Sequence, residues 1–579
     1  MSAESLIMDY FDVWTGAVWR NDVGTRNDEG SHELTGIDCL RELILDLAVR
    51  GRLVAQNPGD EPASTLLNQI AEEKSELAKA GRFRKVKEVD PVSDDEMPFE
   101  LPGSWEWARL PNVAHYSAGK TPATKNPKYW ESSGGTPWVA IGDMCDGGFV
   151  RSTSKSVSDI AVDEVFKQEP VEPGSILMSF KLTLGKVSIN QIPVYHNEAI
   201  ISVHPFSGVD RDYLFRVLPK RAQDGDSKSA IKGKTLNSTS LAKLLIPLPP
   251  VSEQKRIVEK VDELMALCDR LEQQTSDQIR AHETLVDTLL DTLTRSQHGA
   301  ELADNWGRVA EHFDTLFVNE YGIDVLERTI VQLAVVGRLS EEPLGSDLRL
   351  SIRNRDANEA ECGEEPARGT GNGRNDPEVP DQLPRGWQLM RVGDVAAVKG
   401  GKRLPKGHTL RTEDTGFPYI RVTNMKHGGI AQEDIRYLSP ETRRQIRRYD
   451  ISSDDLYITI AGTIGEVGEI PSALDGANLT ENAAKIMPSG VNRKFLKLAL
   501  RAPYVQEQFR AKVNQMAQPK LALHRIESTV IAIPAPSEQA EIVSEVDKLC
   551  ALMEKLRRGV RNAEATRNRF VECIIRDIG

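Results

Sequence analysis

Several short motifs in this sequence come close to catalytic signatures, and each lacks a residue that its chemistry requires. Two Gly-Lys-Thr triplets, at Gly119 and Gly233, lack the upstream glycine of a phosphate-binding P-loop, because Ala114 and Lys228 occupy that position. The run HETLV at His282 lacks the second histidine of a zinc protease pair. The base-methylation motifs NPPF and DPPY are absent, as is a glycine-rich loop for S-adenosylmethionine. We therefore predict a protein that catalyses no reaction and binds no metal or cofactor of its own.

Basic side chains beside turn residues are the better candidates for a site, because they can contact phosphates and guanine edges. They gather in a few loop-like stretches. We predict that the following residues contact DNA: Lys120, Thr121, Lys125, Lys128, Tyr129, Lys181, Lys232, Lys234, Lys399, Lys402, Arg403, Lys406, Arg443, Arg444, Arg447 and Lys520. For any single lysine a solvated surface position is the alternative, whereas the cluster at 399–411 taken together favours DNA.

The charge of the chain is unevenly distributed. The formal net charge is −13 for 579 residues, which by itself argues against a nucleic-acid-binding protein. Within residues 101–250, however, 17 Lys and Arg stand against 14 Asp and Glu, and within 383–535 the numbers are 23 and 15. The other segments carry the acidic excess, so these two basic segments are compatible with phosphate binding.

The same sequence pattern occurs twice, at an offset of 280 to 286 residues. The run PPVSEQKRIVEKVDELMALCDRLE at Pro249 returns as PAPSEQAEIVSEVDKLCALMEKLR at Pro534, with 12 of 24 positions identical. LRELILDLAVRGRL at Leu40 returns as LERTIVQLAVVGRL at Leu326, and LPGSWEWARL returns as LPRGWQLMRV. One tandem duplication explains the pattern. Between the matching points the two copies share little, so the framework is repeated while its contents differ.

Each copy orders its parts alike, as a helical segment, a strand-rich block and a long closing helix. Short β-rich runs such as TPWVAI, SILMSF and DLYITI alternate with Gly and Pro turns in the blocks. We predict an α+β fold in which two α/β domains are separated by two long antiparallel coiled-coil helices, with an internal pseudo-twofold repeat. The predicted parts are an N-terminal helical region (1–100), a first block (101–250), a central long helix (251–298), a second helical region (299–360), a flexible linker (361–382), a second block (383–535) and a C-terminal long helix (536–579).

Apolar residues in the two closing helices are spaced alternately four and three positions apart, which is the pattern of a heptad seam. The seam residues are Ile257, Val261, Leu264, Cys268, Leu271, Ile542, Val546, Leu549, Met553 and Leu556. Such a seam needs a partner, and the helix of the other copy is the nearest one. Packing of each helix on its own block is the alternative.

The cysteines and the apolar runs bear on where the protein works. The six cysteines are scattered without a CxxC pair, which indicates a reducing environment and neither a zinc site nor a disulfide framework. No apolar run approaches 18 residues, and the N-terminal run lacks the features of a signal peptide. We expect a cytoplasmic protein.

This arrangement resembles the specificity subunit of type I restriction-modification systems over nearly the whole chain. The likeness rests on the two SEQ-helix elements that follow proline-rich strands, on LPGSWEWARL and LPRGWQLMRV, on LAVRGRLVAQNPGDEPASTLL and on ITIAGTIGEVG. The resemblance implies that each block is a target recognition domain that reads one half of a split site in double-stranded DNA. It implies that the repeated helices set the gap and dock two methyltransferase subunits. One departure, MSFKLTLGK in place of ITIAGTIGE, predicts a different loop in the first block.

The resemblance also implies ATP-dependent restriction subunits as further partners. S-adenosylmethionine, ATP and Mg²⁺ are implied for these partner subunits and not for this chain. Three other functions remain open from the residues themselves. A free-standing DNA-binding regulator would bind an operator without a methyltransferase, and a protein adaptor would show little salt-dependent DNA affinity. A nuclease is opposed by the missing motifs.

Overall fold

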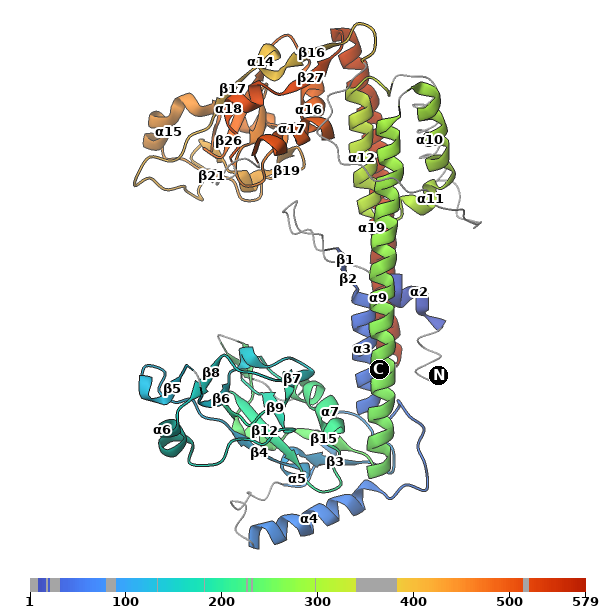
Figure 1. Cartoon of the computed structure of the whole chain (residues 1–579), viewed down its shortest axis with the longest axis vertical. Helices are drawn as coiled ribbons and strands as arrows, with labels where there is room; N and C mark the ends of the chain where they lie inside the picture. Colours follow the sequence, from blue (N-terminus) through green and yellow to red (C-terminus); the bar gives the residue numbers. More distant parts are fainter. Residues whose placement is uncertain are drawn as a thin grey trace. The chain divides into compact units, whose positions relative to one another are not determined.

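The computed structural model describes residues 9–16, 19–20, 32–79, 90–132, 134–181, 183–224, 228–230, 233–296, 298–339, 383–513 and 520–578. The chain divides into two compact units: unit 1 comprises residues 1–19, 33–275 and 567–579, and unit 2 comprises 20–32 and 276–566. Each unit holds one strand-rich block, block 1 (101–250) in unit 1 and block 2 (383–535) in unit 2 (Figure 1). The predicted linker 361–382 lies outside the described residues.

Block 1 is built on a mixed five-stranded sheet. In pairing order its strands are β4 (Ala114–Ala118), β12 (Ile200–Pro205), β9 (Ile176–Ser179), β10 (Val187–Asn190) and β7 (Gly148–Val150). A second sheet has the order β11 (Tyr195–His196), β6 (Thr136–Val139), β8 (Lys155–Val157) and β5 (Trp130–Glu131). The central strand β9 is buried at every position, as its apolar run predicts. Strand β3 (Glu106–Arg109) pairs antiparallel with β15 (Leu245–Leu248), which leads into the long helix.

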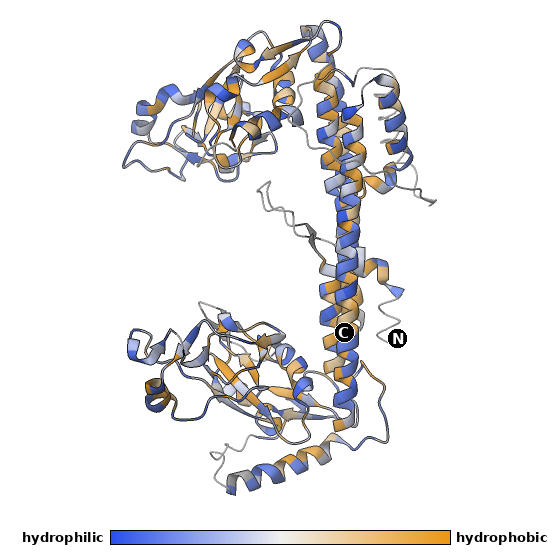
Figure 2. Ribbon diagram, in the orientation of Figure 1, coloured by the Kyte–Doolittle hydropathy of each residue, from blue (hydrophilic) through white to orange (hydrophobic). Residues whose placement is uncertain are grey.

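Block 2 repeats most of this topology with different side chains, and its first sheet lacks a counterpart of β7. Its first sheet has the order β17 (Ala396–Gly400), β26 (Ala483–Pro488), β23 (Leu456–Thr459) and β24 (Val467–Glu469). Its second sheet has the order β21 (Arg436–Tyr437), β18 (Pro418–Ile420), β25 (Ala477–Leu479) and β22 (Asp450–Ile451). Strand β16 (Gln388–Arg391) pairs antiparallel with β27 (Val530–Ile533). Figure 2 shows apolar residues along the central strands of both blocks. The predicted α+β class is confirmed.

Helices account for the rest of each unit. The two long ones are α9 (Val251–Arg295) and α19 (Pro536–Ile578), where the sequence predicted helices over about 252–296 and 537–576. All ten predicted seam residues on α9 and α19 are buried. The other helices of eight or more residues are α3 (Thr35–Val49), α4 (Ala63–Lys79), α7 (Arg211–Asp224), α10 (Gly299–Glu311), α12 (Glu320–Val335), α16 (Arg493–Arg501) and α17 (Pro503–Val513). Among the described helices, none combines the length and apolar character that a membrane crossing needs.

In the repeated Ser-Glu-Gln motif, a buried glutamine connects each long helix to its own block by hydrogen bonds. Gln254 is fully buried; its Nε2 donates to the carbonyl of Pro249 at 3.1 Å, and its Oε1 accepts from the N–H of Asp210 at 2.6 Å. Gln539 repeats both bonds, to the carbonyl of Pro534 at 2.9 Å and from the N–H of Asn492 at 2.7 Å. A buried amide without partners would be costly, which explains why this residue stands at the same place in both copies.

Candidate nucleic-acid interface

A Gly-Lys pair directly follows strand β4 in block 1 and strand β17 in block 2, and it takes up the same position in both. In block 2, Gly401 donates its N–H to the carbonyl of Ala483 at 2.9 Å, and Lys402 donates its N–H to the carbonyl of Leu479 at 2.9 Å. A Cβ at Gly401 would lie 2.1 Å from the carbonyl oxygen of Thr480, so only glycine allows this close approach. The backbone of the loop that follows β17 is therefore anchored while its basic side chains stay exposed.

Block 1 anchors Gly119 and Lys120 in the same way. A Cβ at Gly119 would lie 1.9 Å from the carbonyl oxygen of His196, and Lys120 donates its N–H to that same carbonyl at 2.9 Å. The indole of Trp138 on β6 donates to the carbonyl of Lys120 at 3.0 Å. In block 2 the hydroxyl of Tyr419, on the equivalent strand β18, donates to the carbonyl of Lys402, also at 3.0 Å.

The residue after each of these lysines binds an equivalent glutamate. Arg403 donates from Nε to Oε1 of Glu481 at 2.6 Å, and the hydroxyl of Thr121 donates to Glu198. Burial opposes ionisation of Glu481, but the hydrogen bonds from Arg403, the backbone and Thr480 together outweigh it and hold the pKa of this carboxyl below its usual value. The side chain of Arg403 is nevertheless 80% exposed, so the contact with Glu481 leaves most of it facing solvent.

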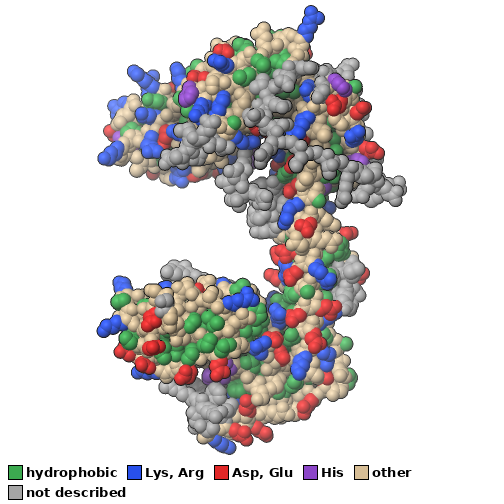
Figure 3. Space-filling model, viewed as in Figure 1, with side chains coloured by type: hydrophobic (Ala, Val, Ile, Leu, Met, Phe, Trp, Pro, Cys, Tyr) green, Lys and Arg blue, Asp and Glu red, His purple; other side chains and the backbone are tan. Residues whose placement is uncertain are grey.

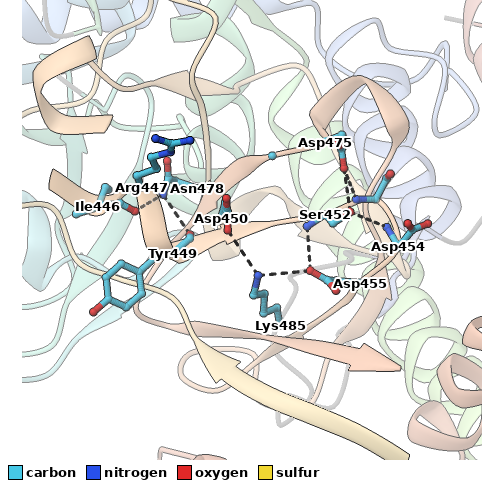
Figure 4. A network of polar contacts seen from close by, with 12 residues as sticks. Ile446, Arg447, Tyr449, Asp450, Ser452, Asp454, Asp455, Asp475, Asn478 and Lys485 are labelled. Carbon is cyan, nitrogen blue, oxygen red and sulfur yellow. Dashed lines mark hydrogen bonds and ion pairs between the residues drawn. The ribbon is translucent and has the colours of Figure 1, made fainter. Parts of the chain in front are cut away.

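A second basic element of block 2 lies beside this loop. Helix α15 (Pro440–Ile446) is followed by a turn at Arg447–Tyr449. The side chain of Asn478 binds the backbone of this turn. Its Nδ2 donates to the carbonyls of Ile446 at 2.9 Å and Tyr449 at 3.2 Å (Figure 4). The guanidinium of Arg447 points away from this network and is exposed. The turn is thus rigid, although its cations face outward.

A partly buried ion network supports the same turn. The Nζ of Lys485 lies 3.6 Å from an oxygen of Asp450 and 3.6 Å from an oxygen of Asp455 (Figure 4). The two carboxylates flank the ammonium, so the network fixes the strand that follows the Arg447–Tyr449 turn.

The loop and the turn enclose one hollow. A cavity of about 280 Å³ is lined by Val398, Lys399, Gly400, Gly401, Arg448, Tyr449, Asp450, Leu479, Lys485 and Leu523. The Nζ of Lys402 lies 5.4 Å from the ring centroid of Tyr449, which joins the two elements by a cation–π contact. Figure 3 shows Lys and Arg side chains spread over the visible face of block 2, at its end away from the helices. This surface can bind an anionic polymer and offers planar groups to bases.

The structure brings some predicted residues together and leaves others apart. In block 2, Lys399 lines the hollow, Lys402 contacts Tyr449 of its lining, and Lys520 reaches the carbonyl of Glu481 at 3.5 Å. Arg403 and Arg447 are exposed in the neighbouring loop and turn and are not among the lining residues. The side chains of Arg443 and Arg444 bind backbone carbonyls of their own segment, at Arg447 and Pro440. Lys406 is exposed in the same loop.

The predicted residues of block 1 are more dispersed. Lys120 donates from Nζ to the carbonyl of Val165 at 2.8 Å, and Tyr129 donates to Glu164 at 2.8 Å. Lys125 and Lys128 are exposed beside the short turn Pro127–Tyr129. Lys234 falls in β14 (Gly233–Thr235), and Lys232 lies outside the described residues.

Lys181 lies in the turn after β9, where the sequence predicted a different loop. The closing bonds are the same as in block 2: Gly185 donates to the carbonyl of Ser179 at 2.9 Å, and Gly465 to that of Thr459 at 2.9 Å. Each hydroxyl, of Ser179 and of Thr459, also binds the carbonyl four residues on. The difference between the two turns is therefore in the side chains.

Sequence reasoning missed Gly119, Gly401, Asn478 and the buried Gln254 and Gln539. The two glycines had a visible signal, because a Gly-Lys pair precedes an aromatic strand position in both blocks, with Lys120 18 residues before Trp138 and Lys402 17 residues before Tyr419. The role of Asn478 had none, since its partners precede it by about 30 residues and are backbone atoms.

Comparison with known proteins gives this surface its context. A family model described as the type I restriction modification DNA specificity domain matches residues 102–281 and again 384–562. The specificity subunit of the type I restriction enzyme EcoAI from Escherichia coli is 31% identical over 610 aligned positions, covering 99% of each chain. The EcoEI specificity subunit, also from Escherichia coli, is 29% identical over 608 positions with the same coverage. A solved chain of a type I restriction-modification system has a TM-score of 0.46 and 16% identity, covering 83% of this chain and 99% of that one.

Two matched blocks, each with an anchored basic loop, define a protein with two DNA-specificity domains. The chain belongs to the specificity subunits of type I restriction-modification systems.

Proposed function

We propose that each block reads one half of a bipartite DNA target for a type I restriction-modification complex. The observation that carries this proposal is the anchored Gly-Lys loop, which occurs once per block on the same sheet topology, while its neighbouring side chains differ. A shared frame orients the DNA backbone, and different side chains read different bases. The frame therefore suits two different half-sites.

The chain contributes recognition and no catalysis in this proposal. Methyltransferase subunits bring S-adenosylmethionine, and restriction subunits bring ATP and Mg²⁺. The names of the EcoAI and EcoEI relatives, as specificity subunits of restriction enzymes, support this division of labour. Two methyltransferase subunits dock on the helices, one for each copy of the repeat, because each copy presents the same framework. Helices α9 and α19 set the gap between the half-sites.

The test is DNA binding by the full chain, assembled with the methyltransferase of its own locus, as a function of salt. Replacing Lys399 and Lys402 by alanine should lower the affinity and reduce the slope of log K against log salt by roughly one per lost phosphate contact. Arg385→Ala is the matched control, because this exposed cation precedes β16, next to the long helix. Equal slopes for the double variant and the unchanged chain would place the loop away from DNA.

The same preparation tests the rest of the proposal. Mapping of methylated adenines on a genome should give one bipartite motif with a fixed gap. The chain alone should transfer no methyl group and hydrolyse no ATP. A contiguous motif, or methylation by the purified single chain, would contradict the division of labour.

A further inference from the structure

An arginine joins the short helix to the long helix in unit 1. Arg41 on α3 has its guanidinium 2.5 Å from Oε2 of Glu272 and 2.8 Å from Oδ1 of Asp269, both on α9. It also lies 3.1 Å from Oδ1 of Asp38, one turn earlier on α3. The arginine side chain is 24% exposed, so water screens these contacts only in part.

Unit 2 contains the same junction with the charges exchanged. Here the arginine is on the long helix: Arg557 of α19 lies 2.7 Å from Oδ1 of Asp324 and 3.0 Å from Oε2 of Glu327, both on α12. It also contacts Glu554, one turn earlier on α19. The side chain of Arg557 is 11% exposed.

The two junctions correspond position by position. Gly51 and Gly337 follow α3 and α12 with φ of +68° and +77°, and they pack on Pro102 and Pro384 in the same way. This places Arg41 at the position of Glu327, since each lies ten residues before its glycine. The Ser-Glu-Gln motifs likewise align Glu272 with Arg557. The flanking acids keep their sign, because Asp38 aligns with Asp324 and Asp269 aligns with Glu554.

The apolar surfaces of these helices are similar in the two copies, and the buried differences are Leu43 against Thr329 and Cys268 against Met553. The buried residues Ile37, Leu40, Ile44 and Leu47 of α3 correspond to Ile323, Leu326, Ile330 and Leu333 of α12. Four of the five seam positions on α9 are also identical to those on α19: Ile257 and Ile542, Val261 and Val546, Leu264 and Leu549, and Leu271 and Leu556. The charged side chains therefore offer the largest difference on which a choice between the two long helices can rest.

We propose that this charge exchange is a pairing key, by which α3 accepts the N-terminal half of α9 and rejects the N-terminal half of α19, and α12 accepts the N-terminal half of α19 and rejects that of α9. If α3 packed on α19, Arg41 would face Arg557. If α12 packed on α9, Glu327 and Asp324 would face Glu272 and Asp269, and four carboxylates would meet without a cation. The partners that the key excludes are the long helices of a second copy of this chain, α19 packed on α3 and α9 packed on α12. Such packing would otherwise give a dimer with exchanged helices.

Two substitutions remove the key and leave an ion pair in place. The variant R41E/E272R gives copy 1 the same charges as copy 2 at all four positions. We expect R41E alone to lower the denaturant midpoint of the full chain and R41E/E272R to recover it. After refolding of full chains at micromolar concentration, R41E/E272R should form on the order of ten times more dimer with exchanged helices than the unchanged chain. Native mass spectrometry, with two differently tagged chains refolded together, measures this fraction.

A fourfold variant supplies the decisive control. R41E/E272R/E327R/R557E exchanges both junctions, so the key is present again with inverted charges, and the dimer fraction should return to that of the unchanged chain. If R41E/E272R recovers the midpoint and stays as monomeric as the unchanged chain, the ion pairs stabilise the junctions without selecting partners, and the proposal is wrong. It is also wrong if R41E/E272R does not recover the midpoint, or if the fourfold variant remains dimeric. DNA binding plays no part in either readout.

Discussion

Gln539 accepts a hydrogen bond from the backbone N–H of Asn492 at 2.7 Å, across 47 positions of the chain. Asn492 caps helix α16 of block 2, whereas Gln539 lies in the first turn of α19. The same amide donates to the carbonyl of Pro534 at the end of β27. One side chain thus joins a cap, a strand end and a long helix, and it is buried in doing so.

Replacing Gln539 by leucine should destabilise unit 2 by about 2 kcal/mol, because a buried N–H and a buried carbonyl lose their partner. Chemical denaturation of the full chain measures the change. Glu541→Ala is the control, since this residue is exposed on the same helix. Gln254→Leu should have a similar effect on unit 1. A change below about 0.5 kcal/mol for both glutamines would mean that water replaces the side chain.

Asn478→Asp should weaken DNA binding about tenfold. A carboxylate cannot donate to the carbonyls of Ile446 and Tyr449, so the turn that carries Arg447 must rearrange. Gln445→Glu, an exposed change on α15 with the same charge difference, separates geometry from charge. If both variants lose affinity equally, the effect comes from the added negative charge and the turn plays no part.

Acid should loosen block 1 before block 2. Burial lowers the pKa of His196 to about 4 and also lowers the pKa values of His115 and His204. The unfolded chain takes up protons near pH 6.5, whereas the folded block stays neutral there, so the full stability is present above pH 6.5 and is lost as the pH falls toward 4. His196 alone accounts for about 2 kcal/mol at pH 5.

Hydrogen exchange, corrected for its intrinsic pH dependence, measures this loss in peptides from β4 and β12. His196→Gln should flatten the pH dependence, and His408→Gln in block 2 serves as its control. Equal pH responses of the two blocks between pH 7 and pH 5 would rule out the histidines as the cause.

Lengthening both long helices should change the gap in the DNA target and leave both half-sites intact. The division between the two units falls between 275 and 276 in α9 and between 566 and 567 in α19. One heptad inserted at each point adds about 10 Å, or about three base pairs, and keeps the seam in register. Methylation mapping reads the new motif. Exchange of residues 101–250 for the block of a relative should do the reverse. A heptad variant that alters a half-site would contradict the separation of roles.

Residues close in sequence were predicted better than residues brought together by the fold. The heptad spacing of Ile257 to Leu271 is local, and it predicted both a helix and a buried seam. The Gly-Lys anchor depends on carbonyls 76 or more residues away, at His196 in block 1 and at Leu479 and Ala483 in block 2, so no local pattern reports it. The exchange of Arg41 and Glu327 looks like an ordinary mismatch between repeats. Its role becomes visible only when the fold places it opposite the second mismatch, between Glu272 and Arg557.

The hydrogen bonds of Gln254 and Gln539 with their blocks end on backbone atoms. A backbone carbonyl is present whatever side chain a block carries, and an N–H is missing only at proline. These four hydrogen bonds therefore do not depend on the side chains of the block, whereas the bond from the indole of Trp387 to Glu538 does. We expect a foreign block that joins at the Pro249 or Pro534 boundary to keep the glutamine bonds and fold. New target sequences would then arise in one genetic step.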